Sequence, residues 1–204
     1  MHVVTKELSR LDRETLLAHF LALDAEDRRL RFGVPLSDFG VKDYVERIDF
    51  ERDAVFGVYD DELKLAGAAH LARGEGFAEL GVSVLPAHRG LGLGGAMLAR
   101  AHVHARNWGL PSLFMHCLSE NGAMMHLARK QGMRIVAESG EADAYLELSP
   151  GDPSSIAREL FAERVGLFDY ALKSQLQAVR RMTAAWMGSE KKQGGKAEKD
   201  EKAA

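Results

Sequence analysis

The 204-residue chain contains a single cysteine, Cys117, so it can form neither an intramolecular disulfide nor a cysteine-rich zinc site. It has no run of about 18 consecutive apolar residues, so no membrane-spanning role is expected. It has no excess of one charge either, because 27 basic side chains stand against 30 acidic ones, which argues against a nucleic-acid-binding protein. The lone cysteine, together with charged residues throughout Met1 to Leu17 where a secretion signal would be apolar, predicts a cytoplasmic protein.

The eight histidines do not follow the spacing of a metal site. His102 and His104 are two residues apart on a predicted helix, and at that separation their side chains point about 200° from one another. They therefore cannot chelate one ion. We predict that the protein has no metal centre.

Turn residues and hydrophobic spacing divide the first 150 residues into short helices and strands. The expected helices are one or two between residues 13 and 32, and others over 41–48, from the glycines at 90–95 to Trp108, and 121–131. The expected strands are 54–59, 63–72, 77–85, 113–118, and a hairpin around residues 139–141. A helix lying between two strands, from 77 to 118, implies a parallel crossover in an otherwise antiparallel sheet. The fold class is therefore α/β (α+β), with a mixed, mostly antiparallel sheet flanked by helices.

Two further segments follow this domain of residues 1–150. Residues 151–188 carry apolar side chains three, four or seven apart, which predicts an amphipathic helical extension, although Gly166 could break it. The stripe could fold back on the domain, pair with a second copy or receive another protein; of these we favour a homodimer. Residues 189–204 are rich in charge and lack large apolar residues, which predicts a disordered tail.

The most informative stretch is Val82 to Gly95, where a strand leads through a glycine-rich loop into a helix. Backbone N–H groups in such a loop can bind phosphate oxygens, and glycine allows the phosphate to approach closely. Gly90, Gly92 and Gly95 satisfy the dinucleotide pattern G-x-G-x-x-G, but no carboxylate follows about 20 residues later and the preceding strands form a meander. No Gly-Lys-Ser/Thr follows the loop either, so it is not a Walker loop. A coenzyme A pyrophosphate is the second candidate ligand for such a loop.

The same stretch resembles the GNAT superfamily of acyl-CoA-dependent N-acyltransferases. The signature of that family is a strand ending in Val-x-Pro, followed by Arg/Gln-x-x-Gly-x-Gly/Ala at the start of a helix, and here it reads V-L-P-A-H-R-G-L-G-L-G from Val84 to Gly94. A second family motif, an Asn followed by a helix that ends in Gly-Phe, is similar to Asn121 through Gly132-Met133. The resemblance covers about residues 1–150 and implies acetyl-CoA as the cofactor.

The resemblance also implies which residues hold that cofactor. The backbone around Val82 and Val84 would pair with pantetheine, the loop amides would hold the pyrophosphate, and Asn121 would face the cofactor unless it only caps its helix. The implied loop residues are Arg89, Gly90, Leu91, Gly92, Leu93, Gly94 and Gly95.

Acetyl transfer to an amine needs a base, because a lysine amine with a pKa near ~10.4 is mostly protonated at pH 7. Glu79 is the one carboxylate on the strand 77–85, and family members often carry a glutamate near this position as the base, although it could also be an ordinary surface glutamate. Many relatives supply a tyrosine as the acid at the position of Ala128, so that acid is missing here. Ser119, Tyr145 or water could replace it.

The resemblance therefore implies an N-acetyltransferase that transfers an acetyl group from acetyl-CoA directly to an amine-bearing acceptor. The stretch Asp24 to Phe32 is similar to the entry helix of GNAT domains in bacterial protein lysine acetyltransferases, which favours a protein lysine or another large amine. Small amines such as polyamines, amino acids or aminoglycosides are the alternative. A catalytically weak acyl-CoA-binding or sensory module is a second alternative, because of the missing tyrosine.

Overall fold

A seven-stranded sheet forms the centre of the protein in the computed structural model, which describes residues 3–201, with side-chain surroundings as far as residue 184. The strand order is β1-β2-β3-β4-β5-β7-β6. The strands are β1 (Lys6–Leu8), β2 (Ala54–Tyr59), β3 (Leu65–Arg73), β4 (Ala78–Val84), β5 (Ser112–Leu118), β6 (Arg134–Glu138) and β7 (Glu141–Glu147). Among these seven strands only the β4–β5 pair is parallel, which confirms the predicted crossover and the mixed sheet.

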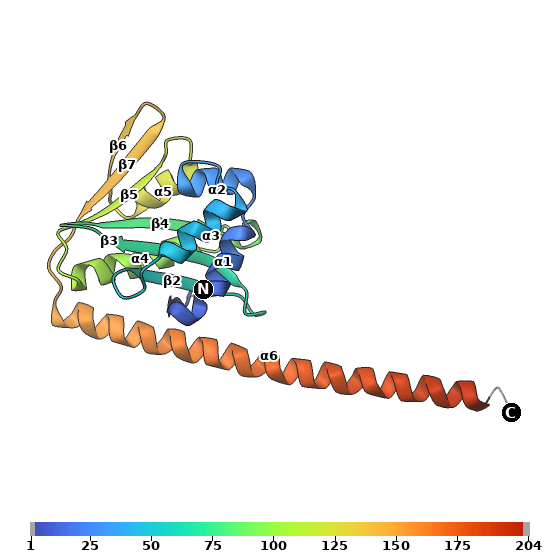
Figure 1. The fold of residues 1–204 in the computed structure, drawn as a ribbon. Helices are drawn as coiled ribbons and strands as arrows, with labels where there is room; N and C mark the ends of the chain where they lie inside the picture. The colour runs from blue at the N-terminus through green and yellow to red at the C-terminus, as the bar shows by residue number, and fades with distance from the viewer. Residues whose placement is uncertain (1–2, 202–204) are drawn as a thin grey trace.

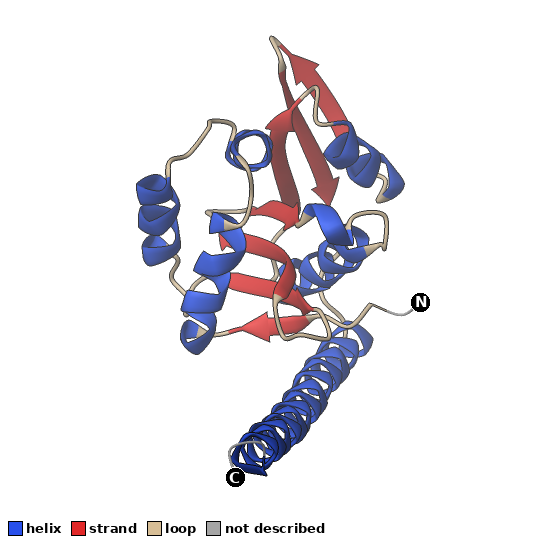
Figure 2. Cartoon of the chain, turned by 90° about the vertical axis from the view of Figure 1, so that its right-hand side faces the viewer, coloured by secondary structure: helices blue, strands red, loops and turns tan. Residues whose placement is uncertain are grey.

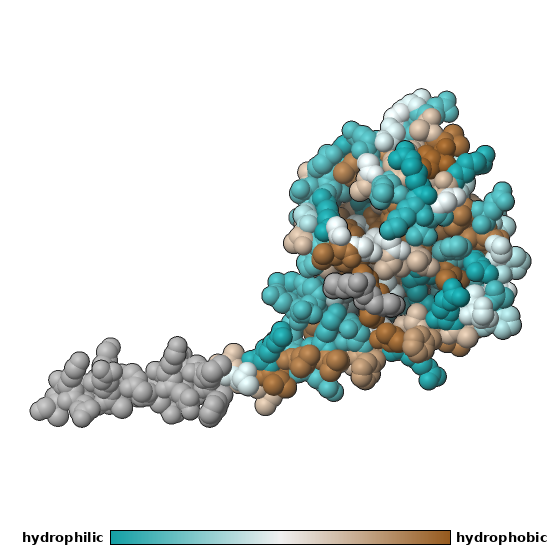
Figure 3. Space-filling view, turned by 180° about the vertical axis from the view of Figure 1, so that it is seen from behind, coloured by the Kyte–Doolittle hydropathy of each residue, from teal (hydrophilic) through white to brown (hydrophobic). Residues whose placement is uncertain are grey.

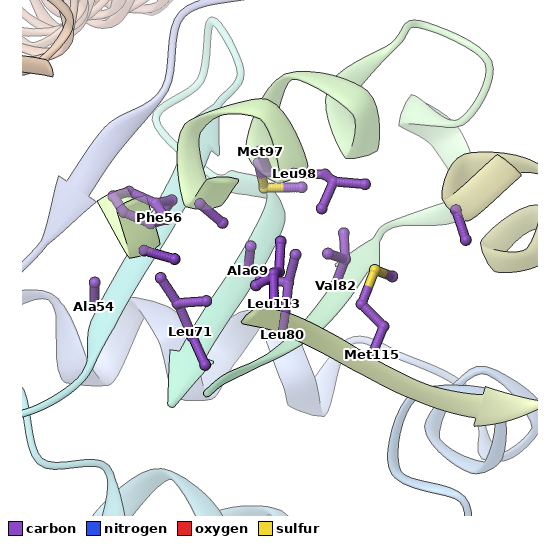
Figure 4. Packing of buried hydrophobic residues seen from close by; sticks show 14 of the residues in the cluster. Ala54, Phe56, Ala69, Leu71, Leu80, Val82, Met97, Leu98, Leu113 and Met115 are labelled. Carbon is purple, nitrogen blue, oxygen red and sulfur yellow. The ribbon is translucent and has the colours of Figure 1, made fainter. Parts of the chain in front are cut away.

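Helices cover both faces of the sheet (Figures 1 and 2). One face carries α4 (Leu93–Asn107) and α5 (Gly122–Lys130), and the other carries α1 (Arg13–Leu21), α2 (Ala25–Phe32) and α3 (Asp38–Arg47). Figure 4 shows Met97 and Leu98 of α4 above the sheet side chains, among them Leu80 and Val82. Because side chains alternate along a strand, Leu80 and Val82 face α4 while Glu79, Gly81 and Ser83 face α1 to α3.

The two central strands separate soon after they meet. β4 and β5 are paired only at Ala78 with Leu113 and at Glu79 with Phe114. From Leu80 onward β4 keeps its pairing with β3 on one side, and no described strand pairs with it on the other. Its free edge therefore offers N–H and C=O groups to a ligand.

The last helix, α6 (Pro153–Glu201), lies against the β1 edge of the domain and then continues well beyond it (Figure 1). Gly166 does not break it. A Cβ at this position would lie 2.4 Å from the carbonyl oxygen of Thr5 and 3.1 Å from the Cα of Lys6, so glycine allows α6 to touch β1. In the described part of the chain, no helix combines the length and apolar character needed to cross a membrane.

Replacing Gly166 with alanine has two opposite effects on the stability of the fold. Helix propensity alone predicts a gain of about 1 kcal/mol, whereas the contact with Thr5 predicts a loss of about 1–3 kcal/mol. We expect the loss to dominate and to lower the melting temperature by several degrees in thermal unfolding. Gly122→Ala is the matched control, because that helical glycine has no atom within 4 Å of an added Cβ; a Gly166→Ala protein as stable as this control would contradict the contact.

Two segments differ from the sequence-based expectation. β1 was not predicted, because Lys6–Leu8 is only three residues long and has no recognisable alternation. Residues 189–201 continue α6 in the structure, where composition predicts a disordered tail, and residues 202–204 of that tail lie outside the described residues.

Candidate active site

A cavity of about 320 Å³ lies beside the free edge of β4. Its walls come from α2, the end of β4, the glycine loop, the first turn of α4 and α5. Nine of the ten residues predicted to bind the cofactor line it: Val82, Val84, Arg89, Gly90, Gly92, Leu93, Gly94, Gly95 and Asn121. The tenth, Leu91, is half exposed and is not part of the lining.

The loop presents unpaired amides to this cavity. Gly90 and Gly92 have φ angles of 77° and 82°, a conformation that side chains disfavour, and no atom lies within 4 Å of a Cβ added at either. The first helical hydrogen bond is the one from the Ala96 N–H to the Gly92 carbonyl, and among the described residues no acceptor pairs with the N–H groups of residues 90–95. Together with the positive end of the α4 dipole, these donors suit an anionic pyrophosphate.

Arg89 connects the loop to α2. Its Nη2 lies 2.6 Å from Oδ1 of the buried Asp27, and its Nε donates to the Val84 carbonyl at 3.2 Å. Asp27 lines the cavity, where an isolated carboxylate would repel an anion, and the guanidinium of Arg89 neutralises it. Arg89 thus keeps the loop joined to α2 and keeps the local charge favourable for phosphate.

Asn121 lines the cavity but its side-chain amide is already engaged. Its Oδ1 accepts from the Met124 N–H at 3.1 Å, as an N-cap of α5, and its Nδ2 donates to the Leu30 carbonyl at 3.3 Å. The residue therefore fixes α5 against α2 and shapes the cavity wall. A direct contact of its side chain with the cofactor stays a prediction.

Glu79 occupies the last position at which β4 and β5 are paired, so it lies where the two strands separate. Its side chain is exposed on the α1–α3 face and makes no hydrogen bond or ion pair with any described residue. It does not line the cavity itself. An unpaired carboxylate next to the strand opening is free to accept a proton from a molecule arriving from solvent.

The candidate acids differ in their surroundings. Ala128 is buried in the core and supplies no proton. Tyr145 donates to Oδ2 of Asp143 at 3.2 Å, and burial together with that carboxylate raises the pKa of Tyr145. Burial, with Asp143 as a smaller cause, also raises the pKa of the thiol of Cys117 on the neighbouring strand β5. Ser119, Tyr145 and Cys117 do not line the cavity.

A chain of hydrogen-bonded polar side chains lies on the face of the sheet that carries α1 to α3, and the sequence did not predict it. Arg31 lies against the backbone of Gly81, where an added Cβ would be 2.3 Å from its guanidinium. Its Nη2 donates to the Tyr44 hydroxyl at 2.9 Å, the hydroxyl lies 2.7 Å from Nδ1 of His70, and Nε2 of His70 lies 3.0 Å from Asp53. The network holds α2 and α3 against β3 and β4.

Beside it, His19 and Ser83 form a buried pair. Nδ1 of His19 lies 2.7 Å from the Leu65 carbonyl, and its Nε2 lies 2.8 Å from the Ser83 hydroxyl. Burial lowers the pKa of His19 to about 4, so the ring is neutral at pH 7. Nδ1 then carries the proton and the Ser83 hydroxyl donates to Nε2, which satisfies both groups.

A third cluster, distant from the cavity, contains residue types that can bind a metal ion. Ligand atoms of Glu7, His104 and Glu159 lie within 4.8 Å of one another. The buried guanidinium of Arg100 lies 3.5 Å from both carboxylates, and Nδ1 of His104 contacts Glu159. An added cation would meet the charge of Arg100, so the cluster is better explained as an ion network that attaches α6 to α4 and β1. The absence of a metal site stays a prediction.

Comparison with known proteins adds to this geometry. Residues 20–133 match the model of the Acetyltransferase (GNAT) family. No curated protein sequence matches the chain. Among solved structures, the GNAT domain of S. lividans PAT is similar with a TM-score of 0.61 at 21% identity, over 71% of this chain and 89% of that one.

Two other solved structures match this chain over most of their own length. Spermidine N-acetyltransferase from Vibrio cholerae, in complex with CoA and spermine, gives a TM-score of 0.55 at 19% identity, over 71% of this chain and 95% of that one. The structure of yncA from Salmonella typhimurium, with its cofactor acetyl-CoA, gives a TM-score of 0.57 at 17% identity, over 74% of this chain and 97% of that one. At these identities the similarity establishes a shared fold.

Proposed function

Because this chain belongs to the GNAT acetyltransferase family, whose enzymes use acetyl-CoA, we propose that it transfers an acetyl group directly to a primary amine. Acetyl-CoA supplies an activated acyl group on sulfur. The observation that carries the proposal is the free edge of β4, which begins after Glu79, the last position paired with β5, and runs to Val82 and Val84 in the cavity wall.

The cofactor-binding part is made of backbone groups. The amides of residues 90–95 bind the pyrophosphate, and the free edge of β4 around Val82 and Val84 pairs with the amide groups of pantetheine. The cavity has room for these groups, because the glycines leave open space at the loop. Arg89 acts indirectly, by neutralising Asp27 and holding the loop.

Glu79 is the proposed general base. It removes a proton from the attacking ammonium, directly or through one water, so that a neutral amine reaches the acyl carbon. A thiol with a pKa near ~8.5 leaves readily as a thiolate, so a missing tyrosine at Ala128 does not prevent the reaction. Solvent is sufficient to protonate it.

The proposed acceptor is a protein lysine or another large amine. Glu79 is exposed at the surface and does not sit inside the cavity, so a side chain presented by a folded or extended protein can reach it. The stretch Asp24 to Phe32, which is similar to the entry helix of GNAT domains in bacterial protein lysine acetyltransferases, supports this acceptor class. Small polyamines are the second candidate, because the similar Vibrio cholerae structure is a spermidine N-acetyltransferase.

The test measures cofactor binding and turnover separately. Calorimetry should detect acetyl-CoA binding, and release of free thiol should follow addition of an amine acceptor. We expect lysine-containing proteins or peptides to give a higher kcat/KM than spermidine. Turnover with spermidine alone would reject the lysine proposal, and binding without turnover for any amine would reject the enzymatic proposal.

A further inference from the structure

Helix α6 contacts the domain through polar and small residues and through one aromatic ring, Tyr170, which packs edge-on against Tyr59 at 4.8 Å. Ser155 and Gly166 are buried against it, and Glu159 is held by the ion network of Arg100 and His104. Further along, Lys173 donates to the Tyr59 carbonyl at 2.9 Å, and the Gln177 amide donates to the Glu62 carbonyl. Apart from Tyr170, the side of α6 that faces its own domain is therefore polar or small.

Most of the large apolar residues of α6 point away from the domain. Phe161 and Phe168 have 70% and 72% of their surface exposed, and Figure 3 shows hydrophobic side chains gathered along the helix. The others that are at least half-exposed, or close to it, are Ile156, Leu160, Leu167, Leu172, Leu176, Val179 and Met182. Contiguous apolar surface of this extent marks an interaction site.

The spacing within this surface is that of a coiled coil. Seven positions follow one another at alternating intervals of four and three residues, and we call them the seam: Phe161, Val165, Phe168, Leu172, Gln175, Val179 and Met182. A repeat of 3.5 residues keeps the same stripe facing a partner helix over many turns. Six of the seven seam residues are apolar, and the exception is Gln175.

We propose that the seam is the interface with a second copy of this chain, as a parallel two-stranded coiled coil. In that arrangement each seam residue meets its own counterpart across the two-fold axis. Gln175 then faces the partner's Gln175, and the two amides can hydrogen-bond to each other where a different apolar helix would leave this group unpaired.

Charge beside the seam agrees with the parallel orientation. Arg164 and Asp169 flank the seam on opposite sides, five residues apart. In a parallel dimer, this is the separation at which residues flanking the seam face each other across the two helices. Arg164 of each copy therefore lies opposite the partner's Asp169, and symmetry repeats the pair.

The available area is also large enough. Nine large apolar side chains, each about half-exposed or more, together offer on the order of 1,000 Å² per chain. Five of the nine lie in the seam. A standard interface buries about 800 Å² per partner, so a dimer that covers most of this surface reaches that size. The seam lies on the helix side away from the ion network, so a second helix does not displace the domain.

Sedimentation velocity of the full chain tests the interface. The wild-type protein should sediment as a dimer, and Phe168→Glu should raise the dimer dissociation constant at least about 100-fold. Ser174→Glu introduces the same charge on an exposed residue next to the seam and should leave the dimer intact. Circular dichroism should show a helix content close to wild type in both variants. A wild-type protein that is monomeric at every soluble concentration overturns the proposal.

Disulfide crosslinking tests the orientation, since Cys117 is buried and gives a low background. Gln175→Cys and Met182→Cys should each crosslink rapidly to their own counterpart, whereas Ser174→Cys should not. In an antiparallel pair at most one of the two seam positions could do so, and that result overturns the parallel arrangement. Co-flotation of a monomeric wild-type protein with vesicles containing phosphatidylserine would place lipid on the seam and also overturn the proposal.

Discussion

Changing Gly92 and Gly94 together to valine is expected to weaken acetyl-CoA binding at least about 100-fold, measured by calorimetry. Gly92 has a φ of 82°, which a β-branched residue adopts only with strain, so the loop must move. A Cβ at Gly94 would lie 3.6 Å from Leu127 and 3.9 Å from Val82, so the methyl groups of valine would fill the space between these walls. Both the donors and the room for the pyrophosphate are then lost.

A control for the general cost of backbone strain is Gly76→Val. Gly76 has a φ of 78° in the turn between β3 and β4, with no atom within 4 Å of an added Cβ, and it does not line the cavity. We expect this variant to lose stability but to bind acetyl-CoA with a dissociation constant near that of wild type. If the double variant bound as tightly as this control, the loop would not be the pyrophosphate site.

The cofactor cavity was predictable because its main parts are contiguous in sequence. A strand, a glycine loop and a helix follow one another between Val82 and Gly95, so local pattern is enough to place their backbone donors together. Alternation along one strand likewise placed Glu79 on the face away from Leu80 and Val82, as the structure has it.

Groups assembled from distant segments were not predictable in this way. Arg31, Tyr44, His70 and Asp53 come from four separate segments, and only the packing of α2 and α3 on the sheet brings them into one network. The pairing of Arg89 with Asp27, 62 residues earlier, has the same origin. No spacing in one sequence encodes such contacts.

Helix α6 was predictable only in part. Its amphipathic pattern predicts a helix, and the same periodicity predicts that its apolar side is buried against another surface. Periodicity does not say which side meets the domain. That choice depends on Gly166, which allows contact with β1, and on the ion network around Arg100, which attaches a polar face.

The variant Glu79→Gln should reduce kcat at pH 7 by about 100-fold or more, with an unchanged dissociation constant for acetyl-CoA. Glutamine keeps the size of the side chain but cannot accept the proton of the attacking ammonium. The side chain is exposed and makes no hydrogen bond or ion pair with described residues, so its replacement should not disturb the fold. Glu75→Gln, at an exposed position in the turn before β4, is the matched control and should retain full activity.

The pH dependence separates the loss of a base from other causes. Without Glu79, only amine that is already deprotonated can react, so the rate of the variant should rise with pH towards the amine pKa near ~10.4. The wild-type rate should level off at lower pH, and the gap between the two should therefore narrow as pH rises. A variant with a constant fraction of the wild-type rate at every pH would make Glu79 a positioning residue, and an unaffected rate would remove it from the reaction.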